Sequence, residues 1–384
     1  MRVIDQGLVC KGLPGSPLAS NCFPSVASLS DGTILVAFRR SAAKDSPSTH
    51  VVVCASKDAG RSWSDPVAPV KDTAWNGTPG SFGAMNLSEV SEGRVLASIL
   101  WVDRTRPDLP FFNPETEGLL PCKNLLYESR DGGASWTFLE VMDTSPFTGR
   151  PTTTGPVLPV APGELAAFYE TNKDYDDPSP WRHRSVVKFS RDGGRTWPEH
   201  AVTTADPAGR VFYWDQRVVV LRPRSLLAFL WTYDREAKKD LPIHWTRSDD
   251  AGRTWTPPRS TGLVGQVAYP AALSDGRIVL PYVDRYASAS IRVRLSVDEG
   301  RSWEQDELTL WPGADERAAR QHHGDGMGQY LQSMQQWSFG LPCAATMPGG
   351  PAHAGSRDHG GDVFISYYAG DPRAQSIHWA LLRA

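Results

Sequence analysis

The stretch that decides the fold is SRDGGRTW, residues 190–197. The same pattern, Ser-x-Asp-x-Gly-x-Ser/Thr-Trp, occurs at four other places: SKDAGRSW (56–63), SRDGGASW (129–136), SDDAGRTW (248–255) and SVDEGRSW (296–303). In such a turn the Asp accepts backbone N–H groups, the Gly supplies a permissive backbone angle, and the Trp supplies packing area. A turn that recurs along the whole chain predicts a repeat protein.

A hairpin pattern lies upstream of each octapeptide, with two apolar runs on either side of a tight turn. Asp31-Gly32 and Asp275-Gly276 mark two of these turns, and Asp-Gly between apolar runs is a strong hairpin signal. A sixth hairpin runs from residues 339–350 to residues 362–370 and has no octapeptide after it. Six hairpins predict an all-β six-bladed β-propeller of four-stranded blades, forming one domain over residues 1–384. We expect RVIDQGLV (2–9) to pair with SIHWALLRA (376–384) and close the ring.

Composition supports an all-β interpretation and excludes several classes of function. The chain has 34 Gly, 31 Pro and 14 Trp, and few stretches have the helical periodicity that a Rossmann fold or a TIM barrel needs. The formal net charge is −3, which argues against nucleic-acid and membrane partners because these usually require a basic excess.

The cysteines and histidines predict neither disulfides nor a metal site. The five cysteines are scattered without CxxC spacing, and the first residues show no signal peptide, so we expect reduced thiols and a cytoplasmic location. The pair His322-His323, with His353 and His359, has no common metal-ligand spacing. We therefore expect no metal and no cofactor.

The blade order predicts where a ligand binds. The octapeptides and hairpin turns lie on one face of the ring, and the opposite face collects the ends of the inner strands and the long loops, including 104–122, 171–184 and 312–337. Aromatic, acidic and arginine side chains concentrate at those strand ends. Aromatic faces pack on sugar rings, carboxylates accept sugar hydroxyls, and Arg binds acidic groups bidentately. The predicted partner is therefore a carbohydrate.

Five copies of the octapeptide, the Asp-box, on a six-bladed plan resemble the sialidase (neuraminidase) superfamily of BNR/Asp-box proteins. The resemblance implies an arginine triad that binds the substrate carboxylate, an Asp acid/base, and a Tyr nucleophile assisted by Glu. In this chain Cys22 stands at the first Arg position, Trp231 at the second and Arg292 at the third. Asp215 stands at the Glu position and Phe339 at the Tyr position.

The resemblance and the strand ends together give two sets of candidate residues. The catalytic candidates are Asp45, Asp215, Tyr213, Tyr233 and Asp234, with Asp45 as the expected general acid and Asp215 as the base or the group that activates a Tyr. The substrate-binding candidates are Arg40, Asp103, Glu170, Trp214, Arg217, Trp231, His244, Arg285 and Arg292.

Alternatives remain open at this point. The first hypothesis is a sialidase-like exo-glycoside hydrolase that acts on an acidic or densely hydroxylated terminal sugar. An inverting enzyme needs only two carboxylates and a water, for which Asp45 with Asp215, or Asp103 with Asp234, are the candidate pairs. A non-catalytic glycan-binding propeller is the second hypothesis. A third is a propeller that acts on uronate glycans through His50 or His244.

Overall fold

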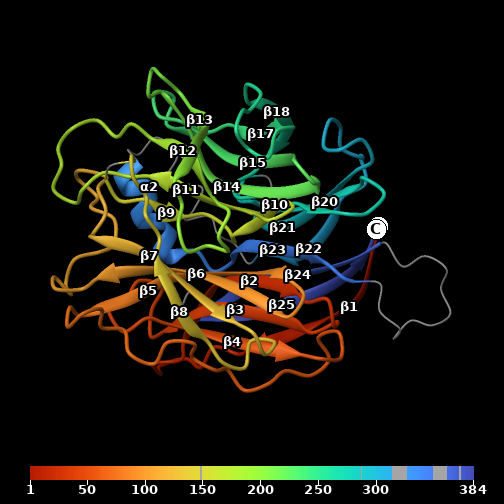
Figure 1. Ribbon diagram of the computed structural model, residues 1–384, viewed down its shortest axis with the longest axis horizontal. Helices are drawn as coiled ribbons and strands as arrows, with labels where there is room; N and C mark the ends of the chain where they lie inside the picture. Colours follow the sequence, from red (N-terminus) through yellow and green to blue (C-terminus); the bar gives the residue numbers. More distant parts are fainter. Residues whose placement is uncertain (148, 287, 314–326, 349–360, 372) are drawn as a thin grey trace.

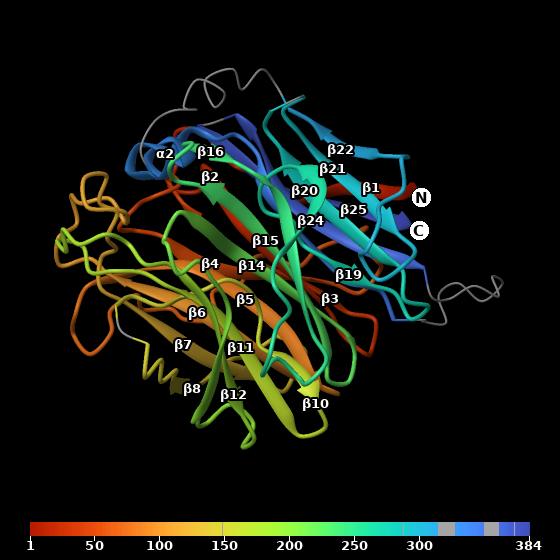
Figure 2. The same cartoon turned by 90° about the horizontal axis from the view of Figure 1, so that it is seen from above.

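The computed structural model describes residues 1–384 except 148, 287, 314–326, 349–360 and 372. In the described part the chain is mostly strand, with one α-helix, α2 (Met327–Ser333), followed by a short 3-10 helix, η1 (Met334–Gln336). The predicted all-β class is confirmed. The sheets stand around a common centre as the blades of a β-propeller, and Figures 1 and 2 show long loops gathered at the end of the ring where α2 lies.

Four of the sheets are separate antiparallel blades of four or five strands. Each blade takes consecutive strands of the chain. The second strand of its main ladder, which is β6, β11, β15 or β20, is buried along its whole length or nearly so. The strands of the four blades are β5 (Gly80–Ser91), β6 (Arg94–Asp103), β7 (Cys122–Ser129) and β8 (Thr137–Val141); β9 (Thr152–Thr153), β10 (Leu158–Ala161), β11 (Glu164–Thr171), β12 (Arg184–Ser190) and β13 (Glu199–Ala205); β14 (Val211–Arg222), β15 (Ser225–Asp234), β16 (Lys239–Asp240), β17 (Pro242–Ser248) and β18 (Arg259–Val264); β19 (Ala271–Ala272), β20 (Ile278–Asp284), β21 (Ser290–Ser296) and β22 (Leu308–Pro312).

The remaining strands form one seven-stranded sheet, which corrects the prediction of six separate blades. Its strands are β1 (Arg2–Cys10), β2 (Ser20–Ser28), β3 (Ile34–Ser41), β4 (His50–Ser56), β23 (Gly340–Thr346), β24 (Asp362–Asp371) and β25 (Ala374–Arg383). Two antiparallel sets, β23-β24-β25-β1 and β2-β3-β4, are joined by one parallel pair, Ser20 with Gln375. The Asn21 side-chain amide donates to the Gln375 carbonyl at 3.3 Å beside this pair. Four blades are therefore separate sheets, not six.

The two ends of the chain meet in this sheet. Strand β1 pairs antiparallel with β25, from Arg2 opposite Arg383 to Cys10 opposite Ile377, and Figure 2 shows both termini at the same edge of the molecule. The predicted pairing of the first and last strands is confirmed. It covers the edge of β25, which would otherwise offer unpaired backbone groups to other chains.

The Asp-box turns have the self-satisfied geometry that their sequence predicted. In the first box the Ser56 hydroxyl donates to Asp58 at 2.8 Å, and Ser62 donates to Asp58 from both its backbone N–H (2.9 Å) and its hydroxyl (2.6 Å). Equivalent bonds occur in the box around Asp131. The hydrogen bonds from Ser62 and Ser56 lower the pKa of the Asp58 carboxyl to about 2. The boxes are structural turns, and in the four separate blades they connect the two outer strands.

The Asp-box tryptophans Trp197, Trp255 and Trp303 contact the preceding sheet. The Trp255 ring lies 6.5 Å from Phe168 and the Trp303 ring 5.7 Å from Phe229, in each case across a blade boundary. Trp197 is 2% exposed and packs in a cluster with Leu96 of β6. Each of these tryptophans therefore links two successive blades, and the core of the ring lies between sheets.

Within the described residues, neither helix has the length and apolar character needed to cross a membrane. All five cysteines are unpaired. His322, His323, His353 and His359 lie outside the described residues.

Candidate active site

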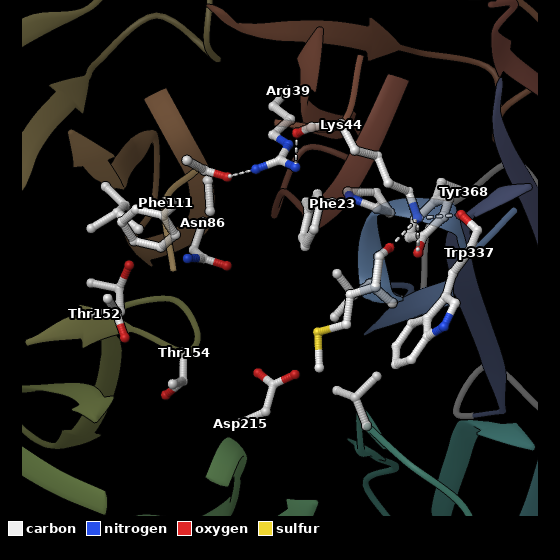
Figure 3. A pocket seen from close by; sticks show the side chains of 18 of the residues that line it. Phe23, Arg39, Lys44, Asn86, Phe111, Thr152, Thr154, Asp215, Trp337 and Tyr368 are labelled. Carbon is white, nitrogen blue, oxygen red and sulfur yellow. Dashed lines mark hydrogen bonds between the residues drawn. The ribbon is translucent and has the colours of Figure 1, made fainter. Parts of the chain in front are cut away.

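A cavity of about 240 Å³ lies between the blades, with residues of the long loops in its wall. Loops between the second and third strands of the blades form part of its wall, as the blade order predicted. Phe111 belongs to one of these loops, the one between β6 and β7, and the η1 residues Met334 and Gln335 complete this part of the wall. The cavity therefore combines side chains from distant parts of the sequence, and Figure 3 shows them facing a common space.

Bulges in the innermost strands turn side chains toward this cavity. The register of β2, β5, β14 and β23 shifts at Phe23-Pro24, Gly83, Asp215-Gln216 and Leu341-Pro342. Phe23, Asp215 and Leu341 have φ angles of 56°, 49° and 43°, and all three line the cavity. A bulge re-aims a side chain, and a positive φ at a residue other than Gly costs of order 1–3 kcal/mol. Such strained positions cluster at functional sites.

Arg39 and Lys44 form a cationic wall. The Arg39 guanidinium stacks on Phe23, 3.9 Å from the ring centre, and donates to the backbone carbonyls of Gly83 (3.2 Å) and Lys44. The Lys44 ammonium donates to the Tyr368 hydroxyl at 3.0 Å and to backbone carbonyls of the η1 segment. Burial lowers the pKa of Arg39. Both cations are held rigidly, which favours binding of a negative or electron-rich ligand group.

Asp215 and Glu170 form a carboxylate pair on the opposite side. Figure 3 shows Asp215 pointing into the cavity from the side opposite Arg39 and Lys44. The Asp215 carboxylate lies 2.5 Å from Arg217, and its backbone N–H donates to the Glu170 carboxylate. Burial raises the pKa of Asp215 to about 6, with Arg217 opposing the shift and the charge of Glu170 adding to it. Acid/base catalysis needs two nearby carboxyl groups, one of which keeps its proton, and a pKa near 6 lets Asp215 be that group.

Several buried N–H groups of the cavity wall have no hydrogen-bond partner among the residues that the structure describes. They are Arg39 Nε, Trp214 Nε1, Arg217 Nε and Trp337 Nε1. Buried polar groups are nearly always satisfied, so donors left open around a cavity call for a ligand or water that supplies acceptors. All four are donors, which favours a ligand rich in oxygen atoms.

Aromatic rings form the remaining part of the wall. Trp214 and Trp231 lie 4.5 Å apart, and Trp337 lies 6.1 Å from Trp231. Tyr330 of α2 packs against this group and donates its hydroxyl proton to Asp240 at 2.6 Å. These rings provide the flat apolar surface on which a sugar ring packs.

A buried polar network fastens α2 behind the aromatic rings. Asp240 accepts from Trp231 Nε1 at 2.7 Å as well as from Tyr330, and Gln266 donates to the Tyr330 hydroxyl at 2.9 Å. Arg285 donates to Gln266 at 2.9 Å. Burial raises the pKa of Asp240 to about 7, against the hydrogen bonds that lower it. The network connects α2 to the residues that line the cavity.

The structure brings half of the predicted site residues together. The residues that line the cavity are Asp45, Glu170, Trp214, Asp215, Arg217, Trp231 and Arg285. Asp45 is engaged by two donors, because Arg104 lies 2.6 Å from one carboxylate oxygen and the Phe111 N–H donates to the other at 2.8 Å.

The other half do not line the cavity, and each has a local partner. Arg292 pairs with Glu307 at 2.5 Å and with Asp284 at 3.2 Å. Asp234 pairs with Arg210 at 2.9 Å, and Asp103 caps the Thr105 N–H at 2.8 Å. The remaining contacts are those of Arg40 with Asn21 and Cys10, of Tyr213 with His244, and of Tyr233 with Tyr330.

The positions taken from the sialidase resemblance are divided in the same way. Cys22 and Phe339 are buried and do not line the cavity, whereas Trp231 does. Arg292, the one triad position that matched, does not line the cavity and pairs with Glu307 and Asp284 instead. The cations that line the cavity are instead Arg39, Lys44, Arg104, Arg217 and Arg285.

The sequence interpretation missed Arg39, Lys44 and Asp240. Arg39 and Arg40 are adjacent in β3, and successive side chains of a strand point to opposite faces, so the sequence alone does not say which one faces the centre. Lys44 follows β3 in a loop, and Asp240 lies in a two-residue strand. A signal existed only for Arg39, as a charged residue at the end of a buried apolar strand.

Comparison with solved structures supports the fold. The chain is similar to a protein of unknown function from Dyadobacter fermentans DSM 18053, with 20% identity and a TM-score of 0.71, over 100% of this chain and 98% of the other. It is also similar to Penicillium chrysogenum α-L-arabinanase complexed with arabinobiose (13% identity, TM-score 0.65, 100% and 99% covered). A third structure is the intramolecular trans-sialidase from Ruminococcus gnavus in complex with oseltamivir carboxylate. It has 12% identity and a TM-score of 0.64, and the match covers 96% of this chain and 96% of the other.

These identities are low, so the three structures show the fold alone. No curated protein sequence matches the chain. Residues 109–319, more than half of the chain, match the family described as the BNR repeat-like domain. The expected membership among BNR repeat proteins is confirmed by this family match, and solved sialidase structures share the fold. The chain belongs to the BNR repeat-like domain family.

Proposed function

We propose that the protein is a glycoside hydrolase that removes an acidic or densely hydroxylated terminal sugar in the central cavity. The observation that carries the proposal is the pair formed by Asp215 and Glu170, in which the pKa of Asp215 is raised to about 6. A carboxyl group that keeps its proton up to about pH 6, well above the range of an ordinary carboxyl, is what a glycosidase needs as its general acid. A cationic wall facing that pair supports an acidic or electron-rich sugar.

In the proposed reaction Asp215 donates its proton to the glycosidic oxygen as the bond from that oxygen to the anomeric carbon breaks. Glu170, fixed by the Asp215 backbone N–H, accepts a proton from the attacking water. The water oxygen bonds to the anomeric carbon, and the leaving group departs as an alcohol. Asp215 is preferred to Asp45 as the acid because both oxygens of Asp45 are engaged by donors.

The remaining wall supports binding and orientation of the sugar. The open N–H groups of Arg39, Trp214, Arg217 and Trp337 would donate to ring, hydroxyl or carboxylate oxygens. Each hydrogen bond to a charged group is worth about 1.5–3 kcal/mol. The aromatic rings would pack against the apolar face of the sugar. His50 and His244 do not line the cavity, so the structure offers no support for histidine chemistry there.

A non-catalytic glycan-binding propeller is the second candidate. The observation in its favour is the 2.5 Å ion pair between Asp215 and Arg217, which would hold Asp215 as an anionic binding group if it persisted at all pH values. Both candidates use the same cavity and the same sugar chemistry, so they differ only in turnover.

The test is a screen of reporter glycosides of neutral, uronic and sialic sugars, followed by variants on the glycoside that is cleaved. We expect Asp215→Asn and Glu170→Gln to lower kcat/KM by about 10²–10⁴. Asp103→Asn is the matched control, because Asp103 caps a turn and does not line the cavity. No turnover of any glycoside, together with glycan-array binding that Asp215→Asn weakens, would favour the binding propeller. Full activity of Asp215→Asn would place the chemistry elsewhere.

A further inference from the structure

A second, wider hollow adjoins the cavity. This groove has a volume of about 1050 Å³ and is more open than the cavity. Its wall comes from five segments that lie far apart in the sequence: residues 15–20, 42–47, 104–110, 332–335 and 373–375. Most of these are loops on the face of the ring that carries the cavity. Most residues of the groove wall lie outside the site described above.

The groove and the cavity meet at shared residues. Lys44, Asp45, Arg104 and Gln335 line both of them. The ion pair of Arg104 with Asp45, at 2.6 Å, and the Phe111 N–H on Asp45, at 2.8 Å, tie the loop after β3 to the loop after β6 at this junction. A ligand that extends out of the cavity on this side therefore enters a groove with a fixed wall.

The two volumes suit different parts of one ligand. The cavity, at about 240 Å³, is smaller than the roughly 300–1,000 Å³ of pockets that hold drug-sized molecules. It suits a single sugar ring. The groove, at about 1050 Å³, has room for several more.

The chemistry of the groove wall fits neutral sugars. Gln332 and Gln335 are exposed amides, and an amide both donates and accepts hydrogen bonds, as sugar hydroxyls require. Arg104 at the junction is already paired with Asp45, and the exposed carboxyl group of Asp108 in the groove wall disfavours acidic sugars. Arg373 pairs with Asp371 at 3.1 Å. Prolines 17, 47, 107 and 110 stiffen the loops, and a stiff wall lowers the entropy cost of binding.

We propose that this groove binds the neutral sugar residues that follow the terminal sugar in a glycan chain, so that it holds the leaving group of the reaction. The inference rests on the proposed function, and it names the substrate class: an oligosaccharide or glycan chain rather than a small glycoside. The terminal sugar occupies the cavity, the scissile bond lies near the junction, and the chain continues along the loops that contain residues 42–47 and 107–110.

The decisive variant fills the groove and leaves the cavity unchanged. Ala43 is exposed and lines the groove but not the cavity, so Ala43→Trp places a large side chain in the proposed path. Ala208→Trp is the control, since Ala208 is exposed and lines neither hollow. The substrates are a reporter glycoside with one sugar and an oligosaccharide of three to five sugars that ends in the same sugar.

We expect Ala43→Trp to lower kcat/KM for the oligosaccharide by at least about 10-fold, the effect of losing roughly one to two good hydrogen bonds. Its activity on the one-sugar glycoside should change less than about 2-fold. Gln332→Ala should lower oligosaccharide kcat/KM by about 3-fold to 10-fold, and Gln336→Ala, an exposed glutamine of the same segment that lines neither hollow, should not. Equal effects of Ala43→Trp on both substrates, or no effect on either, would overturn the groove assignment.

A glycan array of neutral and acidic oligosaccharides separates this inference from the proposed function. Binding that Ala43→Trp abolishes, without turnover of any glycoside, would support the groove and refute the hydrolase. Turnover of glycosides with no dependence on chain length would support the hydrolase and refute the groove. Absence of both binding and turnover would refute both.

Discussion

Arg39 and Arg40 show how one position in a strand decides which residue reaches the ligand. The Arg39 guanidinium lies over Phe23 in the cavity wall, whereas Arg40 donates to Asn21 at 2.9 Å and to the Cys10 thiol at 2.6 Å, away from it. Neighbouring residues of a strand point to opposite faces. The two arginines therefore form a natural pair of test and control.

We expect Arg39→Gln to weaken binding of an acidic sugar by about 1.5–3 kcal/mol, the worth of a charged hydrogen bond. The kcat/KM of the substrate found by the screen should fall by the corresponding factor. Arg40→Gln should leave it unchanged. Steady-state kinetics on both variants, after melting curves confirm that both are folded, check the prediction. A loss in Arg40→Gln with Arg39→Gln unaffected would reverse the assignment of the two faces.

The residue scale is also where the sequence was least informative. Asp215, Glu170, Arg217 and Trp231 line the cavity, as the sequence led us to expect of the first strands of the blades and of the ends of their second strands; their roles stay predictions. Tyr213 was expected beside them but packs on His244, since the bulge at Asp215 changes the alternation of β14. A bulge depends on packing around the ring, so local sequence does not predict it.

At the scale of single elements, the Asp-box turn and its tryptophan were predictable because every bond in the turn is local. The direction in which the tryptophan packs was not, because it depends on the neighbouring blade. The segment of α2 and η1 was expected only as a loop. The seven residues MGQYLQS, with no acidic residue in the first turn and no basic residue in the last, acquire their helical form from tertiary contacts such as those of Tyr330 with Asp240 and Gln266.

The box tryptophans should contribute to stability in proportion to their burial. Trp197 is 2% exposed between two blades, and its indole N–H donates to the Gly194 carbonyl at 3.1 Å. We expect Trp197→Ala to lower the free energy of unfolding by about 3–5 kcal/mol. Trp303→Ala should cost less because Trp303 is only partly buried. Chemical denaturation of both variants measures the difference, and an unchanged midpoint for Trp197→Ala would contradict the role of linking blades.

Asp240 should make the stability that its hydrogen-bond network with α2 contributes depend on pH. Its pKa is about 7 in the folded chain and about 3.9 when unfolded, so the folded state binds more protons in between. The contribution of Asp240 to stability is therefore largest below pH 4 and is lost as the pH rises through 7.

The check compares the free energy of unfolding of the wild type and Asp240→Asn at pH 5 and pH 8. We expect the wild type to lose stability relative to the variant as the pH rises. Asp234→Asn is the control, because hydrogen bonds from Arg210 lower the pKa of Asp234, and its effect should be the same at both pH values. If the free energies of unfolding of the wild type and Asp240→Asn differ by the same amount at pH 5 and pH 8, the raised pKa of Asp240 is refuted.

For the whole molecule, closure of the ring depends on β1. The sequence predicted the pairing of β1 with β25 because both ends of the chain carry strand patterns. It did not predict the merging of β23-β24-β25-β1 with β2-β3-β4 into one sheet, which depends on a single backbone pair between Ser20 and Gln375.

Deletion of residues 2–10 should therefore destabilise the protein and promote association. The deletion would expose the edge of β25, and exposed strand edges pair with other chains. We expect a lower melting temperature and larger species by size-exclusion chromatography. A monomer with an unchanged melting temperature would show that β1 has no part in closure.

The measurement that tests the central claim most directly is the pH dependence of kcat/KM for the wild type and Asp215→Asn on the reporter glycoside that the screen identifies. Because the general acid must hold its proton, we expect wild-type kcat/KM to fall above the pKa of Asp215, about 6. Asp215→Asn should retain only a small residual rate without that decline. A variant that keeps both the wild-type rate and the decline above pH 6 would contradict the assignment of Asp215, and with it the proposed active site.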